Sequence, residues 1–260
     1  MTIYVPGKVT LRQTWQPMDP DAAAYITAVE TADGQALEEK VKIAIDNFVL
    51  GCKADGIWNA IKASCILAGA RTLAGALVPL VGTAPTNYNF VAGDYNRETG
   101  LKGNGSNKYL DSNRANNADP QDSNHNALYV SETVSAGRIL NSGENNVEAG
   151  TNTIAASSSK FNIRNRTSSA VVAIGDNISN SFVSVGRSAS TAIQFRSGGI
   201  TTTHTSASQA PTSEPITLYY GDGGYANPRI AFYSIGESLD LTLLDARVTD
   251  LINAIGVAIP

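Results

Sequence analysis

Short apolar runs at close intervals are the feature that most restricts how this chain can fold. Between residues 64 and 235 they alternate with clusters of Asn, Asp, Ser and Gly, which favour turns. No apolar stripe of helical period interrupts them, so a parallel sheet of strand–helix–strand units is not expected. The spacing predicts a mainly β protein, an antiparallel sandwich of the jelly-roll type. The predicted strands include residues 127–130, 153–156, 170–174, 182–186, 193–196, 216–220 and 229–235.

The composition excludes several other classes of protein. Charged residues make up 16% of the 260 residues, against about 25% in an ordinary soluble domain. A coiled coil or a helical repeat would need far more Glu, Lys, Leu and Arg. The net charge is −4 and there is no basic run, so we expect no nucleic-acid partner.

An extended arm is predicted over residues 1–20. Its prolines disfavour a helix, and apolar residues recur at strand-like spacing. Such an arm buries too little surface to be stable alone, so we expect it to dock on its own domain or on a neighbouring subunit. No charged segment followed by an apolar core is present, so no signal peptide is predicted. The candidate assembly residues of the arm are Ile3, Val5, Val9, Leu11 and Trp15.

A helical segment is predicted over residues 21–63. Asp21 is the expected cap of a first helix that ends near Gly34, and a second apolar stripe follows over residues 37–48. Trp58, Ile61 and Cys65 suggest one more short helical segment. The third predicted unit, residues 64–260, is the sandwich.

Two further segments have a predicted structure within that unit. Residues 64–82 are apolar but contain Arg71 and Pro79, so we expect buried strands around a turn and no membrane span. A closing helix is predicted over residues 242–256. Thr242 and Asp245 form a variant capping box there, and Gly256 can end the helix.

No metal site is predicted. Cys52 and Cys65 match no zinc spacing, and we expect two buried free thiols, with a disulfide between them as the alternative. His125 and His204 are interpreted as surface or turn residues. The Asn- and Asp-rich segment 111–126 is interpreted as a solvated loop, with calcium binding as the alternative.

No catalytic residue and no cofactor are predicted either. Glu144 and Glu148 are the nearest local carboxylate pair, but the residues between them read as a turn and not as a strand. The Gly-rich stretch 100–108 lacks the Gly-Lys-Ser/Thr end of a phosphate loop and is predicted to join two antiparallel strands.

Tyrosines are the candidate binding residues. Aromatic rings can stack on sugars, although tyrosines in strands more often pack across strands. The candidate glycan contacts are Tyr95, Tyr109, Tyr220 and Tyr225, and Tyr88 and Tyr219 are also available.

Four stretches carry a resemblance to a known family. Residues 94–113, 182–188 and 232–240 resemble parts of the concanavalin A-like, laminin-G-type modules of bacteriophage structural proteins. Residues 51–65 resemble the short helix that precedes the module in such proteins. The resemblance implies a jelly roll on a virion, assembled in the host cytoplasm, and no enzymatic activity.

The role that follows from this resemblance has several versions. The preferred one is a tail fibre or spike component that contacts host surface glycans. A capsid decoration protein is the alternative, followed by a glycan-binding module without a structural role and by a polysaccharide hydrolase. The expected partners are other virion proteins and further copies of the chain, with a trimer suggested by the family, and no membrane insertion is expected.

Overall fold

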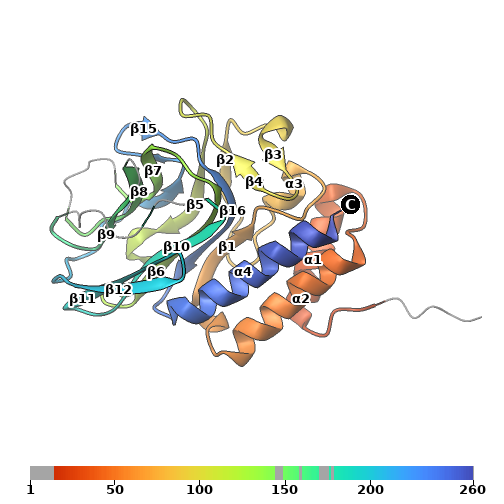
Figure 1. Cartoon of the computed structure of the whole chain (residues 1–260), viewed down its shortest axis with the longest axis horizontal. Helices are drawn as coiled ribbons and strands as arrows, with labels where there is room; N and C mark the ends of the chain where they lie inside the picture. The colour runs from red at the N-terminus through yellow and green to blue at the C-terminus, as the bar shows by residue number, and fades with distance from the viewer. Residues whose placement is uncertain (1–14, 144–148, 158–159, 170–175, 177–178, 260) are drawn as a thin grey trace, which may run out of the picture.

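Within the described part of the chain, the alternating runs form two antiparallel sheets that pack face to face, as Figure 1 shows for the computed structural model. The predicted strand 170–174 lies outside the described residues. The structure describes residues 15–143, 149–157, 160–169, 176 and 179–259. The predicted fold class is confirmed: the described residues form a mainly β antiparallel sandwich with helices before and after it.

Sheet A has eight strands among the described residues and sheet B has six. The order in sheet A is β12 (Ile200–Thr205), β11 (Ala192–Ser197), β10 (Ser181–Ala189), β6 (Asn124–Glu132), β16 (Arg229–Gly236), β4 (Gly100–Lys102) and β3 (Tyr95–Asn96), with β1 (Ile61–Ile66) paired to β16. The order in sheet B is β2 (Thr86–Tyr88), β5 (Tyr109–Ala115), β13 (Pro215–Leu218), β7 (Ala136–Asn141), β8 (Asn152–Ser157) and β9 (Lys160–Asn165). A small hairpin, β14 (Tyr220–Gly221) and β15 (Gly224–Tyr225), adjoins β7.

The central strands of sheet A are buried on both faces. Along β6, Leu128 and Val130 belong to the core between the sheets, whereas Ala127 and Tyr129 belong to a second core under the helices. This split follows from the strand period of two, which sends successive side chains to opposite faces.

A helical layer covers the outer face of sheet A (Figure 1). It consists of α1 (Pro20–Asp33), α2 (Glu39–Ala54) and α4 (Leu241–Ala258), with α2 and α4 packed side by side. Phe48 of α2 meets Phe232 of β16 edge to face, with 5.6 Å between ring centroids. The predicted helical segment therefore shares a core with the sandwich.

The first helix ends as predicted but begins differently. Gly34 adopts the left-handed conformation (φ 69°) at its end. The N-cap is Asp19 and not Asp21, because the carboxylate of Asp19 accepts the backbone N–H groups of Asp21 and Ala22, and Pro20 occupies the first turn, where its missing N–H costs nothing.

The prediction of a third helical segment around Trp58, Ile61 and Cys65 is wrong. Trp58–Ala60 makes one 3-10 turn, and the chain then enters β1, where Cys65 pairs with Tyr233 of β16. The helical pattern rested on only three residues, and the backbone hydrogen bonds that β1 forms with β16 are more favourable than a short helix. After β1 the chain forms a short helix, α3 (Leu73–Ala76), where a further strand was expected.

The closing helix also differs from its prediction at both ends. Its N-cap is Asp240, whose Oδ1 accepts the N–H groups of Thr242 and Leu243, so Thr242 lies inside the helix. Gly256 does not end the helix, which runs to Ala258. Among the described residues, no helix is both long and apolar enough to cross a bilayer.

Two turn predictions need correction. The stretch 100–108 does not join two strands of one sheet, because it leads from β4 in sheet A to β5 in sheet B. His125 is neither on the surface nor in a turn: it lies in β6 and is fully buried. Its ring nitrogens lie 2.6 Å from the Glu237 carbonyl oxygen and 2.7 Å from Ser234 Oγ, so both polar atoms are satisfied without water.

Candidate functional site

Four tyrosines gather at the end of sheet B where the β14–β15 hairpin adjoins it; we call Tyr88, Tyr109, Tyr220 and Tyr225 the tyrosine patch. Tyr88 and Tyr109 are register partners on β2 and β5, and their rings stack at 4.2 Å with 3° between planes. Tyr220 and Tyr225 are register partners across the hairpin, with ring centroids 4.8 Å apart. Tyr109 links the pairs, because its ring lies 5.2 Å from that of Tyr220 and 6.2 Å from that of Tyr225.

The patch is partly open to solvent. Tyr88 is 39% exposed, and the other three rings are half-buried. Burial, followed by the neighbouring Tyr88, raises the pKa of Tyr109 to about 12, so its hydroxyl is neutral at physiological pH and can both donate and accept a hydrogen bond. Aromatic faces beside neutral hydroxyls suit a ligand with alternating C–H and O–H groups.

A charged pair lies beside the hairpin. Arg138 of β7 contacts Asp222 in the hairpin turn, with 3.3 Å between Nη2 and Oδ2. The Nε of Arg138 is buried and has no hydrogen-bond partner within the described part of the chain. Arg138 lies on the strand that adjoins the hairpin, and Asp222 lies in the turn between Tyr220 and Tyr225, so the hairpin carries a charged pair as well as aromatic rings.

A glycine lets the hairpin approach the sheet. A Cβ on Gly221 would lie 2.5 Å from Cβ of Asn141 on β7, which is too close for any other residue without a shift. The patch thus depends on sheet B for its position, and the hairpin is not a free loop.

The sequence predicted three of the four patch residues. Tyr95 does not join them: it lies on β3 in sheet A, and its hydroxyl donates to the Ala70 carbonyl at 2.8 Å. Tyr219 is also separate, because it is fully buried and donates to the Leu101 carbonyl. Tyr88 was named from the sequence only as a further available tyrosine. Arg138 and Asp222 were not named as binding residues, since β2, β5 and β7 come together only through the sheet order.

The cysteines and the Asn- and Asp-rich segment bond and pack within the fold. Cys52 and Cys65 are buried and unpaired, as expected, and burial raises the pKa of each thiol to about 12. The interpretation of 111–126 as a solvated loop is wrong: the segment contains the end of β5 and the start of β6, Asp119 pairs with Arg114, and Asn116 and Asn124 are buried, because side-chain polar atoms of both bond within the fold. No cluster of three His, Cys, Asp or Glu side chains suited to a metal occurs in the described residues.

Part of the predicted sites lies outside the described residues. This applies to Glu144 and Glu148, and to the arm positions Ile3, Val5, Val9 and Leu11. Trp15, the last predicted arm residue, is half-buried and packs against the core under the helices.

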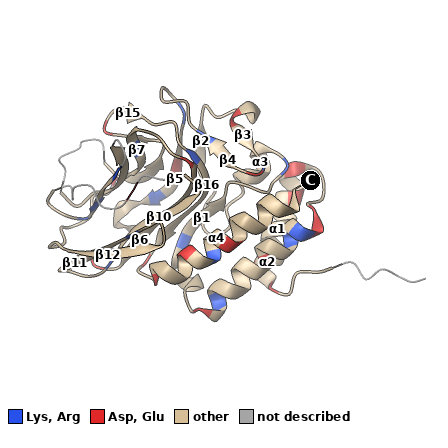
Figure 2. Cartoon of the chain, in the orientation of Figure 1, with Lys and Arg blue, Asp and Glu red and all other residues tan. Residues whose placement is uncertain are grey.

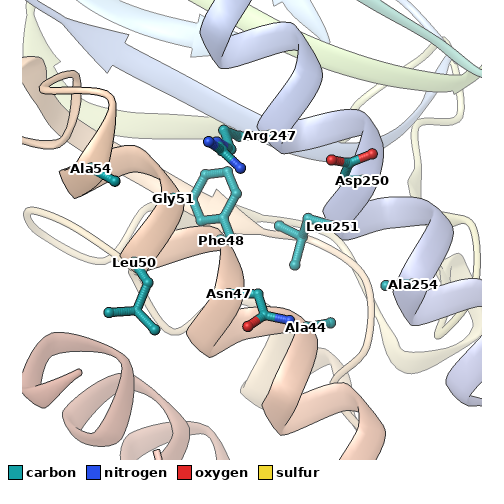
Figure 3. Close-up of a pocket in the computed structure, with 10 residues that line it drawn as sticks. All are labelled: Ala44, Asn47, Phe48, Leu50, Gly51, Ala54, Arg247, Asp250, Leu251 and Ala254. Atoms are coloured by element: carbon teal, nitrogen blue, oxygen red, sulfur yellow. The ribbon is translucent and has the colours of Figure 1, made fainter. Parts of the chain in front are cut away.

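A second surface feature lies in the helical layer. A cavity of about 550 Å³ opens between α2 and α4, with Phe48 and Leu251 among the residues that line it (Figure 3). Charges along these helices are mixed in sign, as Figure 2 shows, and many are paired, for example Arg247 with Asp55 at 2.7 Å.

Comparison with known proteins identifies the fold only. No family model matches the chain, and no curated protein matches it. Among solved structures, the chain is similar to a mutant titled HCR/D (TM-score 0.51, 12% identity, covering 74% of this chain and 52% of that chain). It is also similar to the botulinum neurotoxin serotype D binding domain (TM-score 0.50, 10% identity, 74% and 51%) and to the receptor binding domain of the C/D mosaic serotype (TM-score 0.50, 10% identity, 74% and 51%). The chain thus spans about half the length of these structures.

Proposed function

We propose that this chain is a non-enzymatic binding module whose tyrosine patch recognises a carbohydrate. The observation that carries the proposal is the gathering of Tyr88, Tyr109, Tyr220 and Tyr225 from four strands into one partly exposed aromatic surface. Sugar rings present C–H groups that pack on aromatic faces, and their hydroxyls accept from Arg138 and donate to Asp222. The similar structures are titled binding domains or receptor binding domains, which is consistent with a binding role for this fold.

We place this module on a bacteriophage particle, as a tail fibre or spike component that contacts glycans on the host surface. The support is the resemblance of residues 94–113, 182–188 and 232–240 to modules of phage structural proteins. In this arrangement sheet B and the tyrosine patch face outward, and the helical layer faces the particle.

Binding of the full chain to immobilised oligosaccharides and bacterial surface polysaccharides tests the proposal. Once a binding sugar is found, Tyr88→Ala and Tyr225→Ala are each expected to raise its Kd about ten-fold, the equivalent of losing one aromatic contact of about 1.4 kcal/mol. Arg138→Gln is expected to weaken binding as well.

The matched control is Ile200→Ala, which also removes a large exposed apolar side chain but lies on β12 of sheet A. Its affinity is expected to equal that of the unmodified chain, and thermal unfolding checks that every variant is folded. The glycan proposal fails if no sugar binds, or if the patch variants bind as tightly as the control.

A further inference from the structure

The helical layer carries an open groove between α2 and α4. Two hollows of about 550 and 390 Å³ adjoin each other there and share Ala44, Asn47 and Ala254 in their walls. Small residues line much of it, Gly51 and Ala54 on α2 and Ala258 on α4, and the side chain of Arg247 packs over Gly51.

The surface of the groove is largely apolar, with charges at its margins. Phe48 and Leu251 line one hollow, and Val257, which is 80% exposed, lines the other. Three charged residues line the two hollows: Arg247 is paired with Asp55, Lys40 lies in the second hollow, and Asp250 is exposed and forms no salt bridge within the described residues. An exposed apolar groove of this kind indicates a contact surface.

The first fourteen residues have the composition to fill such a groove. They carry two apolar pairs, Ile3 with Val5 and Val9 with Leu11, and each pair lies on one face of an extended chain. Their charged side chains are Lys8 and Arg12, both basic, so this arm complements the exposed carboxylate of Asp250. The arm lies outside the described residues.

The described chain begins beside α2. The backbone N–H groups of Met18 and Asp19 donate to the carboxylate of Asp46, at 3.1 and 3.0 Å, and the carboxylate of Asp19 binds Lys53 at 2.8 Å. Asp46 and Lys53 lie on the face of α2 next to the one that lines the groove. The arm therefore starts close to the helical layer.

The arm is long enough to cover the groove. Fourteen extended residues reach roughly 46 to 50 Å, whereas the sixteen residues of α2 span about 24 Å. When residues 3–11 lie along the groove of a neighbouring molecule, residues 12–14 remain, and they can bridge about 10 Å between that groove and the described chain.

We propose that the groove between α2 and α4 binds the N-terminal arm of a second copy of this chain. The two apolar pairs of the arm occupy the two adjoining hollows, and its basic residues lie near Asp250. Each copy donates one arm and receives one, which closes a symmetric oligomer. This contact is independent of the tyrosine patch, which belongs to the other sheet.

Light scattering of the full chain over a range of concentrations gives the first test. We expect an oligomer whose dissociation constant rises at least ten-fold when Ala254→Arg blocks the groove. The matched control is Ala246→Arg. Both positions are exposed on α4 and both place the arginine four residues from Asp250, but Ala246 does not line the groove.

A second pair of variants tests the arm. The double variant Val9→Asp with Leu11→Asp is expected to raise the dissociation constant at least ten-fold as well. The control is Thr10→Asp with Thr14→Asp, which changes the opposite face of an extended arm.

Mixing the two defective proteins decides which molecule supplies the arm. The Ala254→Arg chain keeps its arm, and the Val9→Asp, Leu11→Asp chain keeps its groove, so an equimolar mixture is expected to form a 1:1 complex that neither forms alone. The proposal is overturned if the unmodified chain is a monomer throughout, if the arm variant assembles normally because helical faces pack directly, or if the mixture forms no complex because each arm occupies its own groove.

Discussion

His125 is a titratable side chain that the fold holds in its neutral form. The Glu237 carbonyl oxygen can only accept, so Nδ1 donates to it and Nε2 accepts from the Ser234 hydroxyl. Burial lowers the pKa of His125 from 6.5 to about 4. In the unfolded chain the imidazole of His125 therefore binds a proton near pH 6.5, whereas in the folded chain it binds one only near pH 4.

This difference predicts how stability depends on pH. The contribution of His125 to stability is complete above about pH 6.5 and is lost as the pH falls toward 4, with a loss of about 2 kcal/mol between pH 7 and pH 5. Urea unfolding at both values measures it. In His125→Gln the fall between the two pH values should be smaller by about that amount.

The control for this measurement is His204→Gln, which replaces the half-buried histidine on β12. Its fall in stability should match that of the unmodified chain. If His125→Gln loses as much stability between pH 7 and pH 5 as the unmodified chain does, the burial of a neutral imidazole is not the cause.

The start of α4 provides a prediction about a single element. Asp240 accepts hydrogen bonds from two N–H groups of the first turn, at 2.7 and 3.2 Å. Its negative charge also lies at the positive end of the helix dipole, which stabilises the helix. Asp240→Ala should lower the free energy of unfolding by about 1 kcal/mol in urea denaturation.

Thr242→Ala tests the cap that the sequence suggested. Asp240 and Thr242 are both exposed, so neither substitution opens a cavity. Thr242→Ala should leave stability within about 0.5 kcal/mol of the unmodified chain, because this residue lies inside the helix. Equal losses in the two variants would argue against Asp240 as the cap.

The molecule as a whole is expected to unfold in one step. Its helices and sheet A share a core, in which Phe48 is 2% exposed and packs on the fully buried Phe232. Phe48→Ala should destabilise the protein by about 3 to 5 kcal/mol. Helical circular dichroism and the near-ultraviolet signal of the tyrosines in the sandwich should still lose amplitude at the same urea concentration.

Asn47→Ala, at the exposed neighbouring position on α2, is the control and should change stability little. Two separate transitions, with the helical signal lost first, would show that residues 20–54 fold independently of the sandwich.

The binding site shows where reading the sequence succeeds and where it stops. Tyr220 and Tyr225 flank a glycine-rich turn, so their pairing across a hairpin follows from local sequence. Their contact with Tyr109 does not, because β5 reaches the hairpin through β13, about a hundred residues further along the chain. Tyr95, a predicted glycan contact, belongs to the other sheet, and no local pattern reveals this.

The sequence by itself determined the class of the fold and its long helices: a period of two and frequent turn residues require antiparallel strands, and apolar stripes require helices at the two ends. It also determined that both cysteines are buried. Only the tertiary structure decided that residues 61–66 join β16, that His125 and its neighbouring asparagines are interior, and that four tyrosines share one surface. The physical reason is that local periodicity states which face of a strand is apolar, whereas the partner of that strand is selected by packing among segments far apart in the chain.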